Sequence, residues 1–402
     1  IVDYSILKEV NDFDLPPILK LQNHQKELMN YSKNQFLLEG VAGTGKTTIL
    51  LYRFVNDIKN LRGSLDDSLE TILFVTHNDR LKRDIITSLK LFFPPKEYVL
   101  VSKRVKTTRE LFFELLGRSE ETNPSSPNTH EDFLSENELT RERFRRMFDK
   151  NDIDIDLFWE EYRGILRGYN LRGKNPIITH KEYIDIGRRR GRIKPDQRDA
   201  FYHLAKERQS HAKTSNLSFD FNKSWDSLSL CRKVLSEIEQ EQTIQKINCM
   251  YIDEVQDLTK AEMEILLLLL KPDGAKRFAV AGDLSQSIQP SSFTWQALQD
   301  LIYAILNIKV DKHDTLLENF RSTPYLVQAA NRILELQDEL DHESTPELQR
   351  PFAGENTGEP GHIFFGNEDA LLEALRITRG GFRDSYHRRS EERIMARSTA
   401  GY

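Results

Sequence analysis

The sequence has 402 residues and a net charge of −6, from 57 lysines and arginines against 63 aspartates and glutamates. This length predicts two or three domains, and the apolar content is too high for a disordered chain. The apolar run at residues 265–270 is far shorter than the roughly 20 residues of a membrane helix, so a membrane protein is excluded. Two cysteines without a C-x-x-C or disulfide spacing indicate a reducing setting, the cytoplasm or a eukaryotic nucleus, and no structural zinc.

The first 115 residues alternate apolar strands with amphipathic helices, which predicts a parallel sheet covered on both faces. We expect strands at 35–39, 71–76 and 98–102, and a helix at 47–60 after a glycine-rich turn. The chain starts at Ile1 and its first methionine is Met29, so either the true start has been removed or the chain is a piece of a longer protein.

A helical insertion is predicted at residues 116–240. Its beginning is loop-like, and charged helical patterns follow at 141–150, 158–167 and 181–190. The basic run at 187–194 either contacts a nucleic-acid backbone or is a solvated helix end. The α/β pattern resumes with a strand at 246–253, a helix at 260–270 and a strand at 277–281, and the sequence becomes loop-rich from about residue 341.

A phosphate-binding motif follows the first strand. Residues 40–47 read GVAGTGKT and match G-x-x-x-x-G-K-[ST]. Glycines let backbone N–H groups turn toward phosphate oxygens, Lys46 reaches the β- and γ-phosphates, and the Thr47 hydroxyl is placed to bind Mg²⁺. The alternative is a glycine turn with a solvated lysine. The candidate nucleotide-binding residues here are Gly40, Ala42, Gly43, Thr44, Gly45, Lys46, Thr47 and Thr48.

The second motif is acidic: residues 253–257 read DEVQD and follow an apolar strand. Asp253 at the strand end can hold Mg²⁺, and Glu254 can position or deprotonate an attacking water. The alternative is an acidic loop after a core strand. A phosphate loop in the same chain favours the catalytic interpretation and predicts an enzyme that uses ATP and Mg²⁺.

This DEVQD segment resembles the D-E-x-Q-D motif of UvrD/Rep-type superfamily 1 helicases. Further matches occur in the family's order at 21–25 (LQNHQ), 75–78 (VTHN), 105–107 (VKT), 281–288 (AGDLSQSI) and 317–322 (LENFRS). The resemblance implies an α/β, RecA-like phosphate-loop fold. It implies an ATP-binding motor domain at 1–115 and 241–315, the helical insertion at 116–240, and a truncated start of a second motor domain with a basic tail at 316–402.

The resemblance also implies roles for the residues at the matching positions. Gln25 would read the adenine edge, and Phe320 could stack on adenine. Glu254 would act on the water, and Gln286 and Arg321 would sense the γ-phosphate. The implied contacts to the single strand are Thr76, Asn78 and Thr107.

Several positions depart from the family pattern. The family's base-stacking aromatic directly follows Q-S-I, whereas here Phe293 and Trp295 come later and are either shifted stacking residues or core aromatics. Arg109 replaces the usual histidine, and Thr48 follows the phosphate loop where arginine is common. No convincing copy of the later second-domain motifs occurs in the remaining sequence.

The leading hypothesis is the ATP-binding part of a DNA helicase or translocase that acts on single-stranded or partly duplex DNA, with the 3′→5′ polarity that the resemblance implies. A second hypothesis is an ATP- and nucleic-acid-binding module with little turnover, because the missing arginine can contribute about 10³–10⁵ in rate. A third is an RNA-directed motor. The oligomeric state is not predicted.

Overall fold

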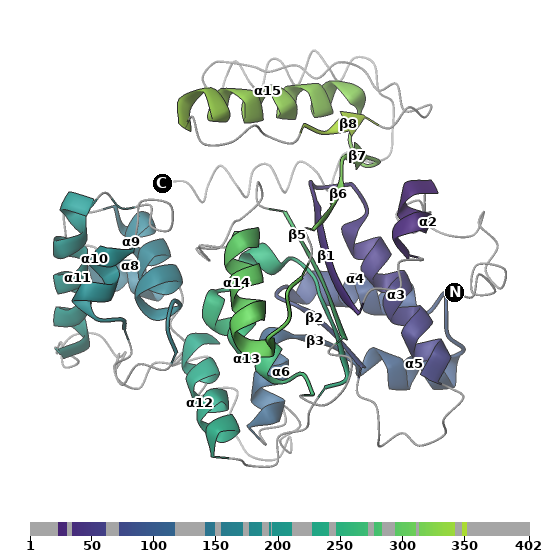
Figure 1. The fold of residues 1–402 in the computed structure, drawn as a ribbon, viewed down its shortest axis with the longest axis horizontal. Coiled ribbons are helices and arrows are strands. Elements are labelled where there is room, and N and C mark those ends of the chain that lie inside the picture. Colours follow the sequence, from purple (N-terminus) through teal and green to yellow (C-terminus); the bar gives the residue numbers. More distant parts are fainter. Residues whose placement is uncertain are drawn as a thin grey trace. The chain divides into compact units, whose positions relative to one another are not determined.

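The computed structural model describes residues 23–29, 34–61, 72–116, 141–148, 154–171, 177–186, 193, 195–210, 227–240, 247–271, 277–283, 294–310, 313–341 and 348–351. Its centre is a six-stranded sheet in the order β3-β2-β4-β5-β1-β6 (Figure 1). All pairings in this sheet are parallel. The strands are β1 (Gln35–Gly40), β2 (Ile72–Thr76), β3 (Val105–Thr107), β4 (Cys249–Ile252), β5 (Arg277–Gly282) and β6 (Asp314–Leu316). The predicted α/β class with a parallel sheet is confirmed.

Each face of the sheet buries its own apolar core, because successive strand residues point to opposite faces. In β1, Phe36 and Leu38 join one core and Leu37 the other. The first core is covered by α2 (Asn23–Met29), α3 (Lys46–Leu61), α4 (Asp79–Leu89) and α5 (Pro95–Ser102). The second is covered by α6 (Thr108–Leu115), α12 (Ser227–Glu239), α13 (Lys260–Leu268) and α14 (Trp295–Leu306). Both helical layers can be followed in Figure 1.

The strand expected at 98–102 is a helix, so this prediction was wrong. Its Val, Leu and Tyr content favours a strand by composition, but Pro95 occupies the first helical turn of α5, where a missing N–H costs nothing. Val101 is buried, whereas Val99 and Leu100 are 53% and 62% exposed. The edge position in the sheet belongs instead to β3, three residues after α5 ends.

The insertion has an aromatic core of its own. It contains α8 (Arg141–Phe148), α9 (Ile155–Glu161), the π-helix η2 (Tyr162–Arg167), α10 (His180–Asp185) and α11 (Pro195–Ser210). Phe144 lies 5.2 Å from Phe158 and 5.0 Å from Trp159, measured between ring centroids. The helix α12 falls within the range expected for the insertion, yet its buried residues belong to the core under the sheet. The basic run at 187–194 lies almost entirely outside the described residues.

A buried ion pair joins the insertion to the sheet domain. Arg163 of η2 lies 3.4 Å from the Glu262 carboxylate at the start of α13. The backbone adds a second contact, because the N–H of Ala261 donates to the carbonyl of Gly168 at 3.0 Å. A Cβ at Gly168 would lie 3.2 Å from the Thr259 Cβ and 2.6 Å from the Arg163 carbonyl oxygen, so close packing at this joint requires glycine.

The chain divides into two compact units, Ile1–Ser322 with Pro346–Phe352, and Thr323–Thr345 with Ala353–Tyr402. The first unit includes a parallel pair of short strands, β7 (Glu318–Asn319) and β8 (Arg350–Pro351). The described part of the second unit is Thr323 and α15 (Pro324–Asp341). Across the described segments, no helix is both long enough and apolar enough to cross a membrane.

Candidate nucleotide site

The phosphate loop connects β1 to α3 and depends on two glycines with left-handed backbone. Gly43 has φ +83° and Gly45 has φ +89°. A Cβ at Gly43 would also lie 2.6 Å from the Arg321 Cβ, and one at Gly45 would collide with the Gln25 amide nitrogen. A side chain at either position is therefore excluded both by conformation and by space.

Lys46 is held inside this loop. Its side chain is buried, and Nζ donates to the carbonyl oxygens of Gly40 at 2.5 Å and Val41 at 3.3 Å. Lys46 is also the first residue of α3, so the positive end of the helix lies at the same place. The loop thus combines a fixed cation with a helix N-terminus, the arrangement that binds phosphate oxygens.

Gln25 of α2 supports the loop from behind. Its amide nitrogen donates to the carbonyl of Thr44 at 2.8 Å, and the side chain is 3% exposed. Reading the adenine edge stays a prediction for Gln25, and in this conformation its amide nitrogen is hydrogen-bonded to the loop backbone. The Thr44 hydroxyl donates in turn to the Val41 carbonyl at 2.8 Å, which tightens the turn.

Asp253 lies directly after β4 and is fully buried. Burial raises the pKa of Asp253 to about 7, the neighbouring Glu254 carboxylate adds to the rise, and Thr47 and Lys46 oppose it. Its Oδ1 accepts the Glu254 N–H at 3.1 Å, whereas Oδ2 is buried without a hydrogen-bond partner among the described groups. A buried oxygen of this kind, with the Thr47 hydroxyl beside it, fits Mg²⁺, which binds through few protein oxygens and keeps sites for water and phosphate.

A larger metal cluster is absent from the described ranges, where no three His, Cys, Asp or Glu side chains gather to hold an ion. These residues therefore offer no metal site made of protein ligands alone, and the fit of Thr47 and Asp253 to Mg²⁺ depends on further oxygens from phosphate and water.

Glu254 has a left-handed backbone, with φ 55° and ψ 46°. A non-glycine residue in this region is uncommon and is often found at functional sites. The Glu254 side chain is partly exposed, and Oε2 accepts a 2.6 Å hydrogen bond from Nε2 of Gln256. The turn therefore presents a carboxylate beside the buried Asp253, at the carboxyl end of β4.

Asn319, the last residue of β7, is hydrogen-bonded to the phosphate loop, a contact that the sequence did not reveal. Its Nδ2 donates to the Ala42 carbonyl at 2.9 Å and to Gln349 Oε1 at 2.8 Å. Its Oδ1 accepts the N–H groups of Arg321 at 2.9 Å and Ser322 at 2.8 Å. Phe320 donates its own N–H to the Gly43 carbonyl at 2.9 Å, and the Arg321 residue is exposed. The sequence signal that could have indicated this contact is the position of Asn319 in LENFRS, a segment that resembles a family motif.

The predicted single-strand contacts lie at the carboxyl edge of the sheet. Thr76 and Thr107 are partners on neighbouring strands, and both are buried. Asn78 is exposed, and its Oδ1 accepts the Arg80 and Leu81 N–H groups at 2.7 and 3.4 Å, which caps α4. The topology therefore brings these three residues to one edge, as parallel strands require.

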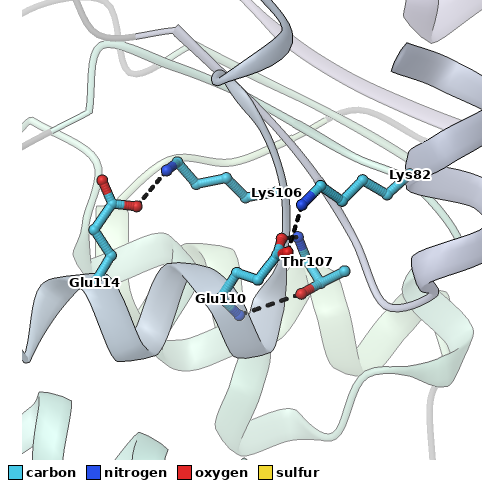
Figure 2. Close-up of polar contacts among 5 residues, drawn as sticks. All are labelled: Lys82, Lys106, Thr107, Glu110 and Glu114. Atoms are coloured by element: carbon cyan, nitrogen blue, oxygen red, sulfur yellow. Dashed lines mark hydrogen bonds and ion pairs between the residues drawn. The ribbon is translucent and has the colours of Figure 1, made fainter. Parts of the chain in front are cut away.

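Figure 2 shows the polar network around Thr107. The Thr107 hydroxyl accepts the Glu110 N–H at 3.2 Å, and Glu110 Oε2 accepts the Thr107 N–H at 2.8 Å, a capping box that starts α6. Lys82 pairs with Glu110, and Lys106 pairs with Glu114. Partial burial opposes charge on Glu110, but Lys82 and the Thr107 N–H outweigh it and lower its pKa. The Thr107 hydroxyl is thus engaged in the helix cap.

Trp295 is 5% exposed and stacks on His313, with ring centroids 4.9 Å apart. It belongs to the core under the sheet, so its surroundings match the core-aromatic alternative. A ring this buried is not available to a base in this conformation. Gln286 and Phe293, the other predicted residues after β5, lie outside the described residues.

The family is decided by comparison with known sequences. The sequence model of the UvrD/REP helicase N-terminal domain matches residues 21–296, which is more than half of the chain. The chain belongs to the UvrD/REP helicase family. ATP-dependent DNA helicase PcrA of Leuconostoc citreum is 25% identical over 331 residues, which cover 79% of this chain and 39% of that protein. The chain therefore spans about two fifths of the length of this curated relative.

Membership in the UvrD/REP family confirms the resemblance drawn from D-E-x-Q-D. The matched range ends at residue 296, so Asn319 and its contacts to the phosphate loop lie beyond it. In this family member, hydrogen bonds from two other elements of the first unit hold the loop: one from Gln25 of α2 and one from Asn319 of β7.

Asn319→Asp is expected to lower the free energy of unfolding by about 1–3 kcal/mol, because the partly buried carbonyl of Ala42 loses its donor and faces a carboxylate. Oδ1 can still accept the N–H groups of Arg321 and Ser322, so the local turn is retained. Chemical unfolding followed by circular dichroism measures the change. Asn34→Asp, the same substitution at an exposed position before β1, should stay within about 0.5 kcal/mol. Equal effects of the two substitutions would contradict the connection.

Proposed function

We propose that this chain is the ATP-binding part of a DNA helicase or translocase, which couples ATP hydrolysis to movement along single-stranded DNA. The observation that carries the proposal is the convergence of Lys46, Thr47, Asp253 and Glu254 at the carboxyl ends of β1 and β4. Lys46 and Thr47 are close enough to Asp253 to lower its pKa, and Glu254 is its neighbour in the chain. Family membership and the likeness to a DNA helicase support the same function.

Lys46 has the central role in nucleotide binding. Its ammonium group now donates to two loop carbonyls, and it would transfer to the β- and γ-phosphates when ATP enters. Thr47 and Asp253 would hold Mg²⁺, which neutralises charge on the phosphates when bound. Backbone N–H groups between Ala42 and Thr48 would complete the cradle.

Glu254 acts on the water that attacks the γ-phosphate. Its carboxylate is partly exposed, so water can reach it, and it is held at a defined position by Gln256. A carboxylate placed this way orients the water and can accept its proton. Arg321 and Gln286 would sense the γ-phosphate, with Phe320 and Gln25 near the base, as the family resemblance implies.

Single-stranded DNA would lie along the edge that carries Asn78, with Thr76 and Thr107 beneath it. The exposed amide of Asn78 is the most accessible of the three side chains. Single-stranded RNA is the competing substrate, and the experiment must distinguish it from DNA. The 3′→5′ direction is inferred from the family alone.

The test is ATP hydrolysis by the chain alone, with single-stranded DNA, and with single-stranded RNA of the same sequence. Lys46→Ala should weaken MgATP binding by about 10- to 100-fold, as expected for loss of hydrogen bonds to charged groups, and should abolish DNA-stimulated hydrolysis. Lys96→Ala, at an exposed lysine of α5, is the matched control and should behave like the unmodified chain.

Each outcome decides between functions. Turnover stimulated by DNA and lost in Lys46→Ala supports the helicase proposal. Stimulation by RNA alone favours an RNA-directed motor. Tight MgATP binding without turnover favours the nucleotide-binding module, because a charge-stabilising arginine from a second motor domain can contribute about 10³–10⁵ in rate.

A further inference from the structure

A single buried side chain connects the ends of two neighbouring strands beside the nucleotide site. Gln256 lies in the 3₁₀ turn η3 (Val255–Asp257), which follows Glu254 directly, and it is 2% exposed. Its Nε2 donates to Glu254 Oε2 at 2.6 Å, and its Oε1 accepts the N–H of Asp283 at 3.0 Å. Asp283 is the first residue after β5, so the amide bridges the turn after β4 to the chain leaving β5.

The surrounding backbone is shaped to admit this amide. Gly282, the last residue of β5, packs against η3, and a Cβ there would lie 2.9 Å from Gln256 Oε1 and 2.7 Å from Val255 Cγ1. Such distances are shorter than normal contacts, so any larger residue would displace the bridge. The left-handed backbone of Glu254 directs the chain so that residues 254 and 256 face each other. Gln256 therefore lies between Gly282 at the end of β5 and the strained turn at Glu254 after β4.

We propose that Gln256 is a positioning residue for ATP hydrolysis, which holds the Glu254 carboxylate and ties its position to the chain that leaves β5. This inference rests on the proposed function. A partly exposed glutamate has several accessible rotamers, and a hydrogen bond from a buried amide restricts it to one. The second hydrogen bond, from Asp283, fixes the amide itself, so a displacement of the β5 end is transmitted to the carboxylate that acts on water.

Gln256→Met tests the bridge, because methionine has nearly the same length and shape but neither hydrogen bond. We expect kcat for ATP hydrolysis to fall by roughly 10- to 100-fold, as for loss of a hydrogen bond to a charged group. The Kd for MgATP, measured with a fluorescent analogue, should change less than about twofold, since the two hydrogen bonds that the variant removes go to Glu254 and Asp283 and not to the phosphate loop. Gln296→Met, at an exposed glutamine of α14, is the control and should leave both quantities unchanged.

Two further variants separate positioning from a structural effect. In a Glu254→Gln background, Gln256→Met should cause no additional loss of kcat, because the residue acts only through Glu254. Gln256→Glu keeps an acceptor for the Asp283 N–H but places a carboxylate against Glu254. It should therefore lower kcat like Gln256→Met while the Asp283 amide remains protected from hydrogen exchange, whereas Gln256→Met should lose that protection.

An unchanged kcat in Gln256→Met, or a loss of kcat that is equally large in the Glu254→Gln background, would overturn the inference. A parallel loss of MgATP affinity would show a general structural role and would also overturn it. If the unmodified chain does not hydrolyse ATP, the proposed function fails by itself. Hydrogen exchange of the Asp283 amide then tests whether Gln256 forms the bridge. The bridge is refuted if the unmodified chain, Gln256→Met and Gln256→Glu protect this amide equally.

Discussion

Glu254→Gln is expected to reduce kcat for ATP hydrolysis by about 10²- to 10⁴-fold, the usual contribution of a positioned general base, while MgATP binding is retained. The amide oxygen of the new glutamine can still accept the hydrogen bond from Gln256 and still faces the same position. What is lost is the negative charge that orients water and accepts its proton. Phosphate release under single turnover and fluorescent-nucleotide titration measure the two quantities separately.

Glu142→Gln is the matched control for this prediction. Glu142 is exposed on α8 of the insertion, and its neutralisation should leave hydrolysis and binding unchanged. If Glu254→Gln hydrolysed ATP at the unmodified rate, the water would have to be activated elsewhere. The role assigned to the turn after β4 would then be wrong, although the phosphate loop would keep its function.

Glu262→Ala is expected to lower the free energy of unfolding by about 3–5 kcal/mol, the cost of leaving one partner of a buried ion pair uncompensated. Burial disfavours charge on Glu262, but Arg163, His77 and the Thr259 N–H together outweigh it and lower the pKa of Glu262. The stabilisation is therefore present at neutral pH, and it is lost as the pH falls through this lowered pKa. Glu262 also closes the capping box of α13 with Thr259, so the substitution removes two interactions at once.

Glu182→Ala separates these two contributions. Glu182 closes the same capping box with Thr179 at the start of α10, but it is exposed and its recorded side-chain partners are Thr179 and Asn170. Its loss should cost about 1 kcal/mol, the usual value of a cap. Urea unfolding of the two variants gives the difference directly. Similar values for both would mean that Arg163 finds another partner or water, and that the insertion is not held by this pair.

Local patterns in the sequence were sufficient for much of the sheet and for the nucleotide motifs. Strands β1, β2 and β5 and helices α3 and α13 agree with their predicted ranges to within two residues. Short apolar runs define the strands locally, and amphipathic patterns define the helices. The exception at α5 has a local cause as well. A proline pair at 94–95 starts the helix, and this signal was outweighed by the β-branched residues that follow.

Long-range contacts had to come from the tertiary structure. The sequence placed α12 in the insertion, because amphipathic helices in the two regions look alike, and only packing shows that its apolar face lies under the sheet. The sequence leaves Trp295 open as a shifted stacking residue or a core aromatic, and its burial against His313 matches the core aromatic.

The sequence by itself determined which residues make up the proposed nucleotide site: the loop with Lys46, the strand-end Asp253 and the adjacent Glu254. These residues belong to two short motifs, and each motif can be recognised from the spacing of a few neighbouring residues. The supporting contacts of Gln256 with Asp283, Asn319 with Ala42, and Glu262 with Arg163 were decided only by the tertiary structure. Each contact joins segments that are far apart in the chain. The residues next to Gln256, Asn319 or Glu262 in the sequence carry no pattern that identifies the distant partner.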